Sequence, residues 1–149
     1  MKTQKGMTIV ELVVATALTG IIVVFLGTAI YQILSVTGYG NDRLMASHDL
    51  ENAAFWLNLD GQQAVTASGG GGLSLTLSDN STVTYTLTGT ELRRNAGGGY
   101  KVLAWNIASI SFSISNRVIT MSLTSTPSGH YDVSENGTFR VHLRPAEAL

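Results

Sequence analysis

The chain begins with a long apolar segment and continues with shorter segments in which apolar and polar residues alternate. Residues 7 to 34 contain a single charged side chain, Glu11. As an α-helix this segment would be roughly 42 Å long, whereas about 20 apolar residues suffice to cross a bilayer. Inside lipid the backbone polar groups need partners within the segment, which favours a helix. The pattern predicts a membrane-spanning helix over residues 7–38.

Two lysines, Lys2 and Lys5, precede the apolar segment. Positive charges close to a span favour the cytoplasmic side, so we expect a cytoplasmic N-terminus with the rest of the chain outside. A secretory signal peptide is a poorer explanation, because the apolar segment is too long and no A-x-A site follows it. A simple signal anchor explains the length and the lysines but not Glu11. The plainest structural explanation places this carboxylate at the membrane interface, where it stabilises the helix N-terminus.

From residue 39 to about residue 67 the apolar residues recur every three or four positions, which predicts an amphipathic helix lying on a sheet. Its expected buried face comprises Ala46, Leu50, Ala53, Ala54, Leu57, Gly61, Ala64 and Val65. The opposite face is expected to carry Asp49, Glu51, Asn52, Asn58 and Gln62. Phe55 and Trp56 are expected to pack in the core, and Gly61 would allow a strand to approach closely. Gly38 and Gly40 mark a bend or are merely tolerated, so one continuous helix and two separate helices both fit.

The pattern over residues 68–149 predicts β-strands, because apolar residues there recur at every second position. The segment SGGGG, residues 68–72, is expected to end the helix as a flexible connector. Turn-forming residues then separate six or seven short antiparallel strands, expected at 73–77, 83–87, 91–94, 100–104, 107–114, 118–123 and 139–143. The fold class is therefore α+β, with a long N-terminal helix packed on a C-terminal antiparallel β-sheet head.

The stretch KGMTIVELVVATALTG, residues 5–20, resembles the type IV prepilin signature. In that family a short basic leader ending in glycine is removed, and the fifth residue of the mature chain is glutamate. The resemblance implies that residues 1–6 are the leader and that a prepilin peptidase cleaves between Gly6 and Met7. It also implies N-methylation of Met7, and pairing of Glu11 with the new amine during assembly. Met7 departs from the family's usual phenylalanine.

The C-terminal part resembles minor pilins and J-type pseudopilins more loosely. The likeness rests on a hairpin ending in Leu-x-Arg and on the spacing of apolar residues after it, carried here by Arg93, Arg94, Leu103, Ile107, Ile110 and Phe112. It implies a structural subunit, not an enzyme, in a type IV pilus or a type II secretion-like filament that serves secretion, DNA uptake or adhesion.

The same resemblance implies a set of partners and a location. The partners would be other pilin or pseudopilin subunits, the prepilin peptidase, an assembly ATPase and a platform protein. The chain would reside in the bacterial inner membrane and then in an extracytoplasmic filament. A major pilin, and a single-pass membrane-anchored binding domain that does not polymerise, remain open as alternatives.

Chemistry outside the N-terminal segment is sparse. The chain has no cysteine and a formal charge of −1, which excludes disulfides and cysteine zinc sites and leaves no basic nucleic-acid footprint. Calcium needs about six to eight oxygen ligands, so we expect solvation of the acidic residues near loops, which are Asp60, Asp79, Asp132 and Glu135. Arg93 and Arg94 are expected to face water rather than an acidic partner. No catalytic residue, metal or cofactor is expected.

Overall fold

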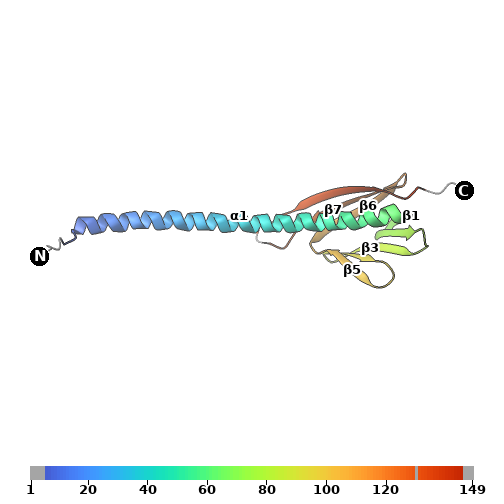
Figure 1. Ribbon diagram of the computed structural model, residues 1–149, viewed down its shortest axis with the longest axis horizontal. Helices are drawn as coiled ribbons and strands as arrows, with labels where there is room; N and C mark the ends of the chain where they lie inside the picture. Colours follow the sequence, from blue (N-terminus) through green and yellow to red (C-terminus); the bar gives the residue numbers. More distant parts are fainter. Residues whose placement is uncertain (1–5, 130, 146–149) are drawn as a thin grey trace. The chain divides into compact units, whose positions relative to one another are not determined.

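The computed structural model describes residues 6–129 and 131–145. It divides into two compact units, Met1–Gly38 and Tyr39–Leu149. A single helix, α1 (Ile9–Gln63), contributes residues to both units, and eight strands follow it within the described part of the chain (Figure 1).

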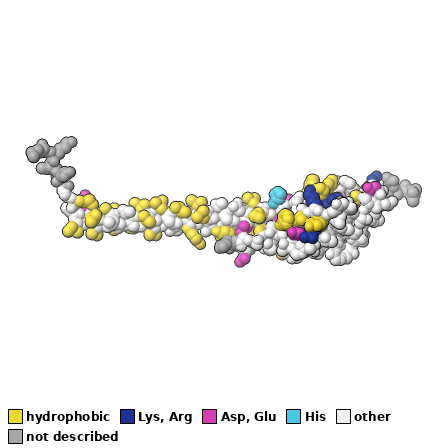
Figure 2. Space-filling model, turned by 90° about the horizontal axis from the view of Figure 1, so that it is seen from below, with side chains coloured by type: hydrophobic (Ala, Val, Ile, Leu, Met, Phe, Trp, Pro, Cys, Tyr) yellow, Lys and Arg dark blue, Asp and Glu magenta, His cyan; other side chains and the backbone are white. Residues whose placement is uncertain are grey.

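In the first unit α1 has no polar face. Each residue from position 6 to position 34 is exposed, and side chains such as Ile9 are as much as 82% exposed. Figure 2 shows apolar side chains along this part of the helix. The hydroxyls of Thr19 and Thr28 each donate to a carbonyl four residues earlier at 2.8 Å, so these polar groups are satisfied within the helix. Among the described helices and strands, α1 is long and apolar enough to cross a membrane.

The second unit, which we call the head, combines the C-terminal part of α1 with two antiparallel sheets. Sheet A has the strand order β1-β2-β3-β4-β5 and sheet B the order β6-β7-β8. The strands of sheet A are β1 (Ala64–Gly70), β2 (Gly72–Leu77), β3 (Thr82–Thr88), β4 (Glu91–Asn95) and β5 (Tyr100–Ala104). Those of sheet B are β6 (Ile107–Ser115), β7 (Val118–Ser125) and β8 (Glu135–His142). The expected α+β fold, with a helix packed on antiparallel sheet, is confirmed.

The core of the head lies between α1 and the inner faces of both sheets. Strand β7 buries every second residue, and β2 and β3 do so over their first halves, as expected of a sheet with one face on the core and the other facing solvent. The core includes Leu50, Ala53, Leu57, Leu73, Leu75, Val83, Tyr85, Leu92, Ile119, Met121 and Leu123. Each fully buried large apolar side chain stabilises the fold by about 1.5–3 kcal/mol relative to exposure. Five residues of the expected helix face are buried, namely Ala46, Leu50, Ala53, Leu57 and Gly61. Ala54 is half-buried, and Ala64 and Val65 lie in β1 rather than in the helix.

Gly61 brings α1 into close contact with sheet B. A Cβ atom built at Gly61 would overlap Cγ1 of Val141 on β8 and would lie 3.9 Å from Cδ1 of Ile119 on β7. Both neighbours are buried, branched side chains with little freedom to move aside. The expectation that Gly61 permits a close strand approach is therefore confirmed.

The end of the helix differs from the expectation. Helix α1 ends at Gln63 rather than near residue 67, and residues 68–72 belong to a β-hairpin rather than to a flexible connector. Strand β1 pairs with β2 in antiparallel register, with Ala67 opposite Leu75 and Gly70 opposite Gly72. Residues 68–70 have no alternating apolar residues, so this end of β1 could not be predicted, although its backbone pairs with β2. With β1 included, the described residues form eight strands rather than the expected six or seven.

Two side chains of α1 lie on the face opposite to the one expected. Phe55 is 60% exposed rather than packed in the core, whereas Asp49, expected to face water, is only 8% exposed. Trp56 does pack against the edge of the core. Asp49 is buried because it binds polar groups of the head, as described below.

Candidate processing and assembly site

The predicted cleavage position lies immediately before the first turn of α1. Gly6, Met7 and Thr8 are non-helical and exposed. Thr8 caps the helix, because its Oγ1 accepts a hydrogen bond from the Glu11 backbone N–H at 3.2 Å and its carbonyl accepts one from Leu12 at 3.1 Å. Thr-x-x-Glu is also the capping-box sequence. A carboxylate at this third helical position is favoured by the helix dipole, by about 0.3–1 kcal/mol.

The Gly6–Met7 peptide bond is open to a peptidase in this structure. No atom lies within 4 Å of the place where a Gly6 Cβ would be, and Met7 is 62% exposed. Exposed, non-helical backbone is the usual substrate for proteolysis. Cleavage there would leave a positively charged amine on Met7, one helical turn before the Glu11 carboxylate. Cleavage, methylation and pairing of these residues remain predictions.

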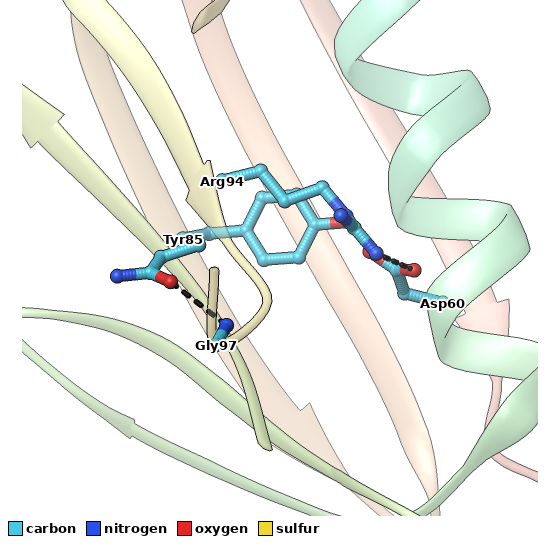
Figure 3. Close-up of polar contacts among 5 residues, drawn as sticks. Asp60, Tyr85, Arg94 and Gly97 are labelled. Atoms are coloured by element: carbon cyan, nitrogen blue, oxygen red, sulfur yellow. Dashed lines mark hydrogen bonds and ion pairs between the residues drawn. The ribbon is translucent and has the colours of Figure 1, made fainter. Parts of the chain in front are cut away.

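In the head, Asp60 and Arg94 form a buried ion pair that the sequence did not predict. Arg94 Nε and Nη2 donate to the two carboxylate oxygens of Asp60 at 2.6 and 2.7 Å (Figure 3). The two side chains are 17% and 4% exposed. The Tyr85 hydroxyl donates a third hydrogen bond to Asp60 Oδ2. Asp60 is therefore not a solvated loop residue, and Arg94 does not face water: the two join the last turns of α1 to sheet A.

The surroundings of Tyr85 and Arg94 keep both side chains protonated. Burial, and then the neighbouring Asp60 carboxylate, raise the pKa of the Tyr85 phenol well above its usual range, so that it stays a neutral donor. The hydrogen bond with Asp60 raises the pKa of Arg94. A carboxylate near the C-terminus of a helix is disfavoured by the helix dipole. Three donors on Asp60 offset that penalty, so the buried cluster is fully satisfied.

Trp56 lies beside this ion pair, and two cations contact its ring. The Arg94 guanidinium lies 4.8 Å and the Lys101 ammonium 4.2 Å from the centre of the Trp56 ring. Arg94 and Lys101 are direct cross-strand neighbours on β4 and β5, an arrangement that costs energy for like charges. The electron-rich face of the indole and the Asp60 carboxylate offset this repulsion.

Asp49 is a second buried carboxylate, and it holds the turn between β5 and β6. Its Oδ1 accepts a hydrogen bond from the Trp105 backbone N–H at 3.3 Å, and its Oδ2 accepts from Asn106 Nδ2 at 2.9 Å and Ser125 Oγ at 3.2 Å. Asp49 and Asp60 are eleven residues apart on α1, and both fall on its apolar stripe. That position on the stripe is the sequence signal that could have identified them as buried.

The other acidic candidates have ordinary structural roles. Ser81 donates its backbone N–H to Asp79 at 2.9 Å and its hydroxyl at 2.5 Å, and these bonds lower the pKa of Asp79. Glu135 pairs with Arg43 at 2.9 Å. In residues 6–129 and 131–145 no three His, Asp or Glu side chains are grouped so as to hold a metal ion.

Arg93 pairs with a carboxylate of its own strand. It contacts Glu91 at 2.6 Å, and both side chains are more than a quarter exposed. The guanidinium also lies 4.4 Å from the centre of the Tyr100 ring. The expectation that Arg93 simply faces water is therefore only partly met.

Comparison with known proteins identifies the N-terminal segment. Residues 1–27 match the family model described as the prokaryotic N-terminal methylation motif. No curated protein and no solved structure matches the chain. Together with the apolar helix, the motif supports a type IV pilin-like prepilin that is anchored in a membrane. Proteins of this class are generally structural, and they interact with other pilin subunits and with prepilin peptidase.

Proposed function

We propose that this chain is a structural subunit of a type IV pilus or type II secretion-like filament, most like a minor pilin or pseudopilin. One observation carries the proposal: the methylation motif at residues 1–27 overlaps the N-terminal part of α1, where each side chain up to residue 34 is exposed in the described structure. Such a surface needs lipid before assembly and neighbouring helices after it. Glycines at positions 20 and 27, seven residues apart on one helix face, leave room for a close helix contact.

The proposed sequence of events begins in the bacterial inner membrane, with a cytoplasmic N-terminus. Prepilin peptidase cleaves between Gly6 and Met7 and methylates the new amine of Met7. The platform protein and the ATPase then move the subunit into a filament. There the Glu11 carboxylate pairs with a Met7 amine, in its own chain or in the preceding subunit. In a low-dielectric filament core an unpaired carboxylate is costly, so the pair sets the register of the incoming subunit.

Glu11→Ala is expected to leave cleavage after Gly6 nearly intact and to reduce incorporation into filaments. The peptidase acts on the exposed segment before the helix, whereas the carboxylate is needed only where water is excluded. Loss of the cap contribution is worth at most about 1 kcal/mol and does not prevent helix formation in lipid. The measurement is the fraction of the chain in sheared filaments relative to the membrane, with leader removal followed in the same samples.

Two matched variants separate charge from shape at this position. Glu11→Gln keeps the shape and loses the charge, so it should behave as Glu11→Ala does. Glu11→Asp keeps the charge and should retain part of the incorporation. Normal assembly of Glu11→Ala would refute the pairing.

Two alternatives make different predictions. A major pilin would dominate the mass of purified filaments, whereas a minor subunit would be scarce in them. An anchored binding domain that does not polymerise would keep its leader and stay in the membrane fraction.

A further inference from the structure

The loop that joins β7 to β8, residues 126–134, lies against the first turns of α1 within the head. The rings of Tyr39 and Tyr131 meet edge to face, with their centres 6.4 Å apart. A Cβ atom built at Gly129 would overlap the Asp42 carboxylate, so the loop backbone lies directly against α1 at this point. The loop and the first turns of the head's helix therefore form one surface.

Further contacts hold both ends of this loop. At its start the Thr126 N–H donates to the Asn106 carbonyl at 2.7 Å, and near its end Val133 is buried. Arg43 of α1 pairs at 2.9 Å with Glu135, the first residue of β8. The loop is therefore fixed along α1 rather than attached only through its two strands.

These contacts lie where the chain leaves the predicted membrane span. Tyr39 and Asp42 precede Ala46, the first buried residue of α1, and Tyr39 directly follows the span expected over residues 7–38. As a helix the span would be roughly 48 Å long, and at a typical tilt of ~20° it would cross about 45 Å, the thickness of a bilayer with its headgroups. Chain connectivity thus puts Tyr39, and with it the neighbouring Tyr131, at the outer surface of the membrane.

The two tyrosines have the chemistry that this position favours. Tyr39 is 47% and Tyr131 37% exposed, so both rings are accessible from outside the head. Tyrosine is enriched at membrane–water interfaces, because its ring is apolar and its hydroxyl bonds polar groups at the headgroup level.

The charges around the two rings indicate which lipid they suit. Residues 126–134 contain no Lys or Arg, and Arg43 is paired with Glu135. Asp42 and Asp132, close to the rings in the sequence, would repel an anionic phospholipid. The ammonium group of a zwitterionic headgroup is instead attracted both by carboxylates and by the face of an aromatic ring.

We propose that this loop rests on the outer surface of the membrane while the chain is anchored there, with Tyr39 and Tyr131 among the headgroups of zwitterionic phospholipids. The head then contacts the membrane at a place other than the apolar helix. The inference needs a membrane-anchored chain but not its assembly, so its failure would leave leader removal and the pairing of Glu11 as proposed.

Quenching of tryptophan fluorescence by brominated lipid tests this contact. The chain has two tryptophans, and the variant Trp56→Phe/Trp105→Phe/Tyr131→Trp carries a single one in the loop. The full-length variant is reconstituted into phosphatidylcholine vesicles whose acyl chains are brominated close to the ester bonds. Its emission should fall about twofold relative to unbrominated vesicles, because an interfacial ring lies within reach of the bromine atoms. Tyr39→Trp in the same background should be quenched to a similar extent.

The variant Trp56→Phe, which keeps Trp105, is the matched control. Trp105 is 60% exposed, but its backbone N–H is bound by Asp49, roughly 15 Å beyond Tyr39 along α1, so its emission should change little. Quenching at position 131 that is no stronger than at Trp105 overturns the contact. Quenching at position 39 without quenching at position 131 overturns it as well, because the loop would then lie away from the membrane.

A change of lipid tests the preference for zwitterionic headgroups. Replacing part of the phosphatidylcholine with an anionic phospholipid, at a constant share of brominated chains, should leave quenching at position 131 unchanged or lower. An increase that high salt removes would show attraction to anionic lipid and would overturn this preference.

Discussion

Replacing Arg94 with alanine is expected to destabilise the head by about 3–5 kcal/mol, the cost of breaking one side of a buried ion pair. The Asp60 carboxylate, whose side chain is 4% exposed, would keep only the Tyr85 hydroxyl as a donor near the end of α1. Domains are stable by about 5–15 kcal/mol, so much of the head's stability would be lost. The measurement is the urea unfolding of the full chain in detergent, followed by near-UV circular dichroism.

Arg93, which directly precedes Arg94 on β4, is the matched control. It pairs with Glu91, and the two side chains are 28% and 26% exposed, so this pair is far more hydrated. Arg93→Ala should cost only about 0–1 kcal/mol, as partly exposed pairs generally do. Equal losses of unfolding free energy for Arg93→Ala and Arg94→Ala would show that the buried Asp60–Arg94 pair stabilises the head no more than the partly exposed Glu91–Arg93 pair does.

Gly61→Val is expected to destabilise the head by about 1–3 kcal/mol or more, because side chains added to a packed core force backbone shifts. A Cβ at this position already overlaps Val141, and the branched side chain of valine would push α1 away from β8. Unfolding by urea gives the loss of stability, and hydrogen exchange of β8 should increase with it.

Gly40 is the matched control for Gly61. It also lies within α1, but no atom approaches the place of its Cβ within 4 Å. Gly40→Ala should stabilise the helix, by up to about 1 kcal/mol, because alanine has the higher helix propensity. A Gly61→Val variant as stable as the parent would contradict the close helix–strand packing.

Much of the fold could be predicted from local patterns in the sequence. The apolar period of three and four residues identified Leu50, Ala53 and Leu57 as core positions, because this period follows directly from helix geometry. The same spacing placed Gly61 where the strand approaches. The alternation in β2 and β3 was equally informative, since each strand has one buried face.

The buried polar contacts could not be predicted in the same way. Asp60 and Arg94 are 34 residues apart, and Asp49 binds groups 56 to 76 residues away. Charged side chains are assumed to face water unless a partner is known, and these partners become neighbours only when the sheets form. Strand β1 was missed for a related reason, since its second half consists of Ser and Gly and its pairing with β2 forms only when the sheet does.

The N-terminal segment, in contrast to these buried contacts, could be interpreted from its sequence. Its cap, its open peptide bond and its apolar helix are all local features, and they are recognisable from adjacent residues.

The central claim is that this chain is processed as a prepilin and then assembles. Its most direct test is the intact mass of the chain isolated from its host membranes, with fragmentation of its N-terminus. The account predicts a chain that begins at Met7 and carries one methyl group on its amine. A chain that retains residues 1–6, with the peptidase present and active on other substrates, would contradict it.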